Sequence, residues 1–123
     1  MNTKVFENLS IRSVNNYAKK FVEEKYKTEK YQIKVTRIMK NNHLVSIKEI
    51  ERQNLFCHLN QIYLDKFSYV YFMIVFKEGI ICCNIPSKYF KTIELCSQHS
   101  SKCFQASICL NTIIKNYKES YIS

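Results

Sequence analysis

Glycine and proline are almost absent from this sequence, because its 123 residues contain one of each and no tryptophan. Collagen-like, low-complexity and linker-rich chains need many glycines or prolines, so the sequence excludes these classes. Aspartate is equally scarce, since Asp65 is the only one among ten carboxylates. Metal-assisted phosphoryl transfer needs carboxylates that converge on a cation, so this composition argues against such chemistry.

Apolar and basic residues are abundant. Hydrophobic residues make up 46% and aromatic residues 14% of the sequence, which predicts one folded domain over residues 1–123. Nineteen Lys and Arg against ten Asp and Glu give a net charge of +9, which favours an anionic partner such as nucleic acid. The longest apolar run, residues 69–76, is too short for a membrane helix, so we expect no membrane contact.

The six cysteines would suit a secreted disulfide scaffold if a secretory leader came first. Met1 is instead followed by polar residues, without the apolar core of a signal peptide. We therefore expect reduced thiols inside the cell.

The spacing of apolar residues changes twice along the chain. Helical spacing predicts a helix over residues 11–25, within an N-terminal helical segment 1–28, and a second helix over residues 103–119. Between them, residues 29–95 alternate in the manner of strands, with turns at Asn41-Asn42 and Glu78-Gly79. Five strands are expected, over residues 31–39, 43–50, 55–60, 68–77 and 80–85.

Short strands joined by short connections favour an antiparallel arrangement, because parallel strands need helical crossovers. The strand count fits the five-stranded oligonucleotide-binding (OB-fold) barrel. We therefore expect an all-β barrel with a helix at each end. Glycine is missing from every predicted strand, although coiled barrel strands commonly bend at glycine.

The predicted C-terminal helix carries more apolar residues than one docking surface needs. Two interpretations follow from the pattern. The helix is either an assembly seam that packs on helices of other chains, or a broad core helix of its own domain.

Four segments of the chain resemble the smallest subunit of replication protein A. Residues 11–22 and 31–39 are similar to the opening of that family, and residues 69–83 and 105–117 to its last barrel strands and terminal helix. The resemblance implies a non-catalytic subunit of a heterotrimer with two other OB-fold subunits. It also implies that the last helix joins a three-helix bundle through Ala106, Cys109, Leu110, Ile113, Ile114 and Tyr117.

The richness in Lys, Asn, Ile and Tyr is typical of an AT-rich genome such as a ciliate's, where a similar subunit belongs to a trimer bound to telomerase. The resemblance thus implies a nuclear protein that acts in DNA replication or telomere maintenance, with telomerase proteins as further partners. Single-stranded DNA would be bound mainly through the partner subunits. The alternative within this class is the smallest subunit of the telomere-capping trimer.

Direct contact with single-stranded DNA is a separate hypothesis. Basic residues on or beside the first hairpin would lie near Tyr71 and Phe72 if the barrel closes, and such binding requires cations beside exposed rings. A solvated basic face over core aromatics is the favoured interpretation, because alternation turns many rings inward. The candidate contacts are Lys34, Arg37, Lys40, Lys48 and Arg52.

Two chemical alternatives remain weaker. Cys96, His99, Cys103 and Cys109 include one zinc-ligand spacing, but no second matching pair of ligands exists. Cys82 and Cys83 point to opposite faces of a strand and suit packing better than redox chemistry.

A nuclease would need more acids than this sequence offers. Gln32 and Lys34 follow a helix that contains Glu23 and Glu24, which faintly resembles restriction-endonuclease-like enzymes. No aspartate precedes this strand, and Gln32 stands where such an enzyme has an acid. We therefore expect no catalytic residue, no metal and no cofactor.

Overall fold

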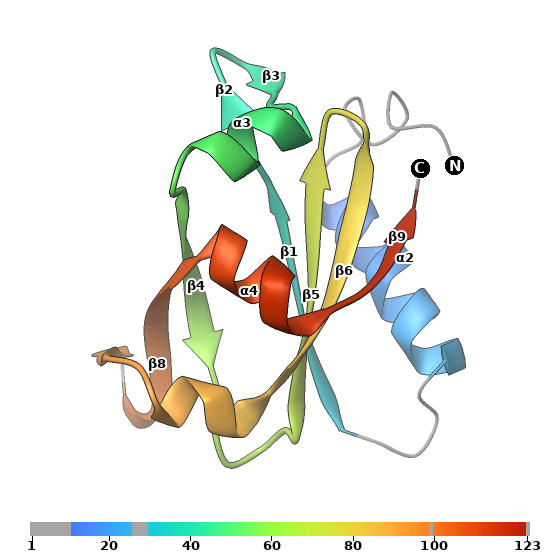
Figure 1. Cartoon of the computed structure of the whole chain (residues 1–123). Coiled ribbons are helices and arrows are strands. Elements are labelled where there is room, and N and C mark those ends of the chain that lie inside the picture. Colours follow the sequence, from blue (N-terminus) through green and yellow to red (C-terminus); the bar gives the residue numbers. More distant parts are fainter. Residues whose placement is uncertain (1–10, 26–29, 99, 123) are drawn as a thin grey trace.

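The computed structural model describes residues 11–25, 30–98 and 100–122 as a small β-rich domain with several sheets and helices (Figure 1). None of the described helices has the length and apolar character of a membrane span. The helices are α2 (Ile11–Lys25), α3 (Ile47–Arg52), the 3₁₀ helix η1 (Ser87–Lys91) and α4 (Leu110–Tyr117). The strands are β1 (Tyr31–Arg37), β2 (Met39–Lys40), β3 (His43–Leu44), β4 (Phe56–Ile62), β5 (Tyr69–Phe76), β6 (Gly79–Pro86), β7 (Leu95–Gln98), β8 (Ser100–Cys109) and β9 (Lys118–Ile122).

The strands form three sheets. The largest has the order β1-β5-β6-β9, in which β1 runs parallel to β5 and the other neighbours are antiparallel. A second sheet, β4-β8-β7, is antiparallel throughout, and β2-β3 is a short hairpin. Within the described residues no hydrogen-bonded ladder joins β1 to β4, so the sheets are not closed into a barrel by backbone pairing.

Strand β5 lies between two hydrophobic cores. Every residue from Val70 to Phe76 is buried, and successive side chains point to opposite faces of the sheet. Phe72 and Ile74 join a core with β4, β8, α3, α4 and η1, whereas Tyr71 and Met73 join a core under α2. Burial on both faces explains why this strand is continuously apolar in sequence.

Helix α2 covers one face of the four-stranded sheet, while α4 and the β4-β8-β7 sheet lie on the other face (Figure 1). Ala18 and Val22 are four residues apart on α2 and are both buried against this face. Cys82 belongs to the core under α2 and Cys83 to the opposite core. The prediction that these two cysteines are packing residues on opposite faces is confirmed.

The two larger sheets meet through side chains at the β1–β4 seam, where Gln32 and Thr36 face β4. The Gln32 carboxamide accepts a hydrogen bond from Tyr63 N–H at 3.2 Å and donates one to the Gln61 carbonyl. Gln61 has a φ of 56° and lies where β4 slips register against β8. Four residues after Gln32 on β1, the Thr36 hydroxyl accepts a hydrogen bond from the Cys57 thiol at 3.7 Å. Gln32 thus satisfies backbone groups that the β4 bulge exposes.

Several predicted elements are confirmed. Helix α2 has the predicted bounds, within the described part of segment 1–28, and β1 lies inside the strand predicted over residues 31–39. Asn41 and Asn42 have φ values of 52° and 66° in the β2–β3 turn. The hairpin of β5 and β6 turns at the predicted position.

The strand predicted over residues 43–50 is wrong beyond Leu44, because the chain turns into α3. Ser46 is the N-cap of α3, and its hydroxyl accepts a hydrogen bond from Glu49 N–H at 3.3 Å. The spacing of Ser46 and Glu49 is that of a capping box, a local signal that outweighs the alternation of Val45 and Ile47.

The helix predicted over residues 103–119 is wrong in its first half. Residues up to Cys109 belong to β8, and α4 contains only eight residues. Ala106 and Ile108 alternate with the more exposed Gln105 and Ser107, which is the period of a strand. Strands also extend beyond the predicted range 29–95, because β8 and β9 complete the two sheets.

We expect Gln32→Ala to lower the free energy of unfolding by about 2 kcal/mol, because Tyr63 N–H and the Gln61 carbonyl would lose a buried partner. Urea denaturation of the purified domain measures this change. Gln53→Ala is the matched control, because the side chain of Gln53 is exposed. Equal stability of the two variants would contradict the assigned role of the seam.

Candidate functional site

Two hollows flank strand β4. The first, the β1–β4 hollow, has a volume of about 490 Å³ and lies between β4, the end of β1, β2 and α3. The second, the sheet-face hollow, has a volume of about 340 Å³ and lies on the outward face of the β4-β8-β7 sheet. Phe56 and His58 line both hollows, so β4 forms the ridge between them.

Phe56 is the most exposed large apolar side chain among the described residues, at 64%. It begins β4, and its neighbours Leu55 and Cys57 are only partly exposed and pack on the core. Alternation along the strand therefore turns Phe56 outward, together with His58. The fold itself does not use most of this ring.

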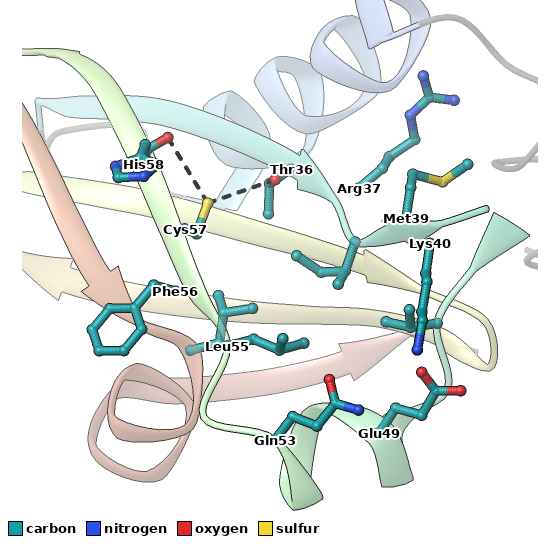
Figure 2. A pocket seen from close by; sticks show the side chains of 13 residues that line it. Thr36, Arg37, Met39, Lys40, Glu49, Gln53, Leu55, Phe56, Cys57 and His58 are labelled. Atoms are coloured by element: carbon teal, nitrogen blue, oxygen red, sulfur yellow. Dashed lines mark hydrogen bonds between the residues drawn. The ribbon is translucent and has the colours of Figure 1, made fainter. Parts of the chain in front are cut away.

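Cationic side chains line the β1–β4 hollow on the side opposite Phe56 (Figure 2). Lys40 extends toward Glu49 of α3, whereas the guanidinium of Arg37 points away from α3. Met39 lies beside these cations and is 43% exposed. The hollow thus combines exposed apolar groups with positive charge at one end of the molecule.

The five predicted DNA contacts do not lie together. Arg37 and Lys40 line the β1–β4 hollow, whereas Lys48 and Arg52 are exposed on α3 and do not line it. Lys34 lies on the face of β1 that carries Gln32 and Thr36, and desolvation lowers its pKa. Of the five residues, Arg37 and Lys40 are thus the two that line this hollow.

The ring partners proposed for these cations were wrong. Tyr71 and Phe72 are completely buried in the two cores, as the favoured interpretation of core aromatics had it. Burial raises the pKa of Tyr71 well above its ordinary value. Phe56, on the opposite side of the hollow from these cations, is instead the exposed aromatic residue of the hollow.

The predicted interface residues belong to the core of their own domain. Ala106, Leu110 and Ile113 have no exposed surface, and Ile114 and Tyr117 pack against the same core. Tyr117 also contacts Tyr89 of η1 edge-on, with ring centroids 5.4 Å apart. The broad apolar stripe is thus covered by β6, β8 and η1, which removes the physical reason for a second chain.

Cys109 precedes α4 and pairs in register with Phe56. The backbone amide of Thr112, in the first turn of α4, stabilises the thiolate and lowers the pKa of Cys109. Burial has the opposite effect on Cys83 and raises its pKa to about 12. The six cysteines are all unpaired with one another.

The residues of the zinc hypothesis are not brought together in the described part of the chain, where no three candidate ligands cluster. Cys96 is exposed on β7 and Cys103 is buried on β8, while His99 lies outside the described residues. The residues of the nuclease hypothesis do not form one site either. The carboxamide of Gln32 is hydrogen-bonded to the backbone of the β4 bulge. Gln32 and Glu23 line a hollow beside α2, and Lys34 does not line it.

The sequence analysis did not predict a candidate site on the outward face of the β4-β8-β7 sheet. His58 pairs with Ser107, and Cys96 pairs with Gln105, so these side chains share that face. A local signal existed for β4, because Phe56 alternates with Leu55 and Cys57 and shares its face with His58. The β8 residues carried no such signal once they had been assigned to a helix.

No family model, curated protein or solved structure matches the chain.

We expect Ile113→Ala to lower the free energy of unfolding of the isolated domain by about 2–5 kcal/mol, because it leaves a cavity in the core. Chemical denaturation followed by circular dichroism measures the change. Thr112→Ala, at an exposed position on the same helix, is the control. An Ile113→Ala variant as stable as the wild-type chain would instead restore the assembly seam.

Proposed function

We propose that this chain is a non-catalytic domain that binds single-stranded nucleic acid across the β4 ridge. The observation that carries the proposal is the exposed ring of Phe56 between two hollows, one of them lined by Arg37 and Lys40. Proteins that bind single strands combine a cationic groove for the backbone with aromatic rings for the bases.

The exposure of Phe56 supports this function energetically. Burying a phenylalanine side chain contributes about 1.5–3 kcal/mol, and the fold leaves most of this gain unused at Phe56. Stacking one base on an aromatic ring contributes about 1–3 kcal/mol. A bound base would therefore recover a free energy that the isolated domain forgoes.

Charge supports the same partner. The net charge of +9 attracts polyanions from solution, and Lys40 and Arg37 place positive charge on the side of the β1–β4 hollow opposite Phe56. A single strand fits better than a duplex, because only an unstacked base offers its face to Phe56.

A role in an assembly is the second part of the proposal. The four resembling segments support a small subunit of a complex of the replication protein A type, in the nucleus, with two OB-fold partners and a function in replication or at telomeres. The β1–β4 seam supports a half-open OB-like barrel, in which side chains take the place of one backbone ladder. Because Leu110 and Ile113 are internal, the proposal places partner contacts outside the α4 stripe.

Phe56→Ala should weaken binding to a short mixed-sequence single-stranded DNA about tenfold, because it removes one stacked base. Phe56→Tyr should bind as the wild-type chain does, because it keeps an aromatic face. Fluorescence anisotropy at fixed salt measures both dissociation constants. Unchanged affinity in Phe56→Ala would refute binding at the ridge.

Lys40→Ala should reduce the slope of log affinity against log salt by about 0.7, the value expected for one phosphate contact to a single strand. Lys20→Ala is the charge-matched control, because Lys20 is exposed on α2, on the other side of the four-stranded sheet. Equal slopes for both variants would show that only the overall charge attracts the strand.

Co-expression tests the assembly role. Two OB-fold partner subunits of the replication protein A type should co-purify with the wild-type chain. They should co-purify equally well with Thr112→Ala, a variant at an exposed position of α4, because the proposal places the partner contacts outside α4. A monodisperse, partner-free chain whose thermal stability does not rise in the presence of such a pair would exclude this role and leave the DNA-binding proposal intact.

A further inference from the structure

The two hollows differ in charge. Two cations, Arg37 and Lys40, and one carboxylate, Glu49, line the β1–β4 hollow, whereas the charged side chain among the residues lining the sheet-face hollow is Glu94. A carboxylate repels phosphate groups, and cations attract them. A strand that crosses the ridge therefore places its phosphates on the β1–β4 side and turns a base toward the outward face of the sheet.

We propose that the sheet-face hollow reads the base and favours bases that carry an exocyclic amino group over thymine and uracil. This inference rests on the proposed single-strand binding and deepens it. The hollow is lined by Glu94, Gln105, Ser107 and His58, together with Cys96 and the ring of Phe56 on which the base would stack. The first four of these side chains are polar.

The sheet register holds the polar groups in one cluster. Ser107 pairs with His58 on one side, and Gln105 pairs with Cys96 on the other. Glu94 directly precedes Leu95, which pairs with Ala106, so its side chain lies beside this part of β8. His58, Gln105 and Ser107 lie on paired strands, which fix the spacing of side chains better than a loop would, and Glu94 immediately precedes β7.

Glu94 is the group that discriminates. Within the described residues it has no hydrogen-bond or ion-pair partner, and an ionised carboxylate can only accept hydrogen bonds. Cytosine and adenine offer an exocyclic amino donor on the edge that a single strand exposes. Uracil and thymine present a carbonyl oxygen at that position, which a carboxylate repels.

Gln105 and Ser107 complete the recognition. A carboxamide both donates and accepts, and a hydroxyl does the same, so these two side chains can donate to the ring nitrogen or carbonyl next to the amino group. Such side chains adapt to more than one base. The choice between an amino group and a carbonyl therefore depends on Glu94.

The test compares a single-stranded DNA of deoxycytidine with one of deoxyuridine of equal length, because the two bases differ at the position that Glu94 would contact. Each unlabelled strand competes with the labelled mixed-sequence probe at fixed salt. The wild-type chain should bind the cytosine strand about tenfold more tightly, the value of one charge-assisted hydrogen bond.

Glu94→Gln should bring the two affinities within about twofold of each other, because a carboxamide can donate to a carbonyl as well as accept from an amino group. The change keeps the shape of the side chain. Glu23→Gln, at an exposed position on α2, removes the same charge elsewhere and should leave the tenfold ratio unchanged.

Equal wild-type affinity for both strands would overturn this inference, and the proposed function would still stand if Phe56→Ala weakened both. A cytosine preference that persists in Glu94→Gln would also overturn it, because the hollow would not be the reader. Failure of the wild-type chain to bind either strand would refute the proposed function and this inference together.

Discussion

The burial of the β5–β6 hairpin on both faces is the constraint on which the rest of this structure depends. Side chains from Val70 to Phe76 and from Ile80 to Cys83 are withdrawn from water, and each large one contributes about 1.5–3 kcal/mol when fully buried. A hairpin buried on one face would leave half of them wet. The chain therefore supplies α2 on one side and the β4-β8-β7 sheet with α4 on the other.

This demand for cover decides which surfaces remain for binding. The apolar stripe of α4 is packed against β6 and η1, so it is not available for contact with another chain. The β4-β8-β7 sheet is different, because its inward face completes the core and nothing described covers its outward face at the sheet-face hollow. An exposed ring at Phe56 is tolerated there because the core is complete without it.

The sequence predicts correctly those elements whose apolar residues fit either the helical or the strand period, but not both. The hairpin of β5 and β6 and the helix α2 belong to this group. The stretch from Ala106 to Ile113 does not, because Ala106, Ile108 and Leu110 follow the period of a strand while Leu110 and Ile113 follow that of a helix. Leu110 belongs to both patterns, so the boundary depends on β8 pairing with β4, a contact between residues about fifty positions apart.

The candidate site was predictable only in its local part. Composition indicated an anionic partner, and proximity to the first hairpin selected Arg37 and Lys40 along with three cations that lie elsewhere. Alternation in residues 55–60 places Phe56 on the same face of a strand as the polar residues His58 and Asn60. An aromatic ring on this face is not part of the core. The hollow beside it required β7 and β8 to bring Glu94 and Gln105 next to β4, and no local pattern encodes such a pairing. A binding face built by long-range strand pairing therefore becomes visible only once the sheet register is known.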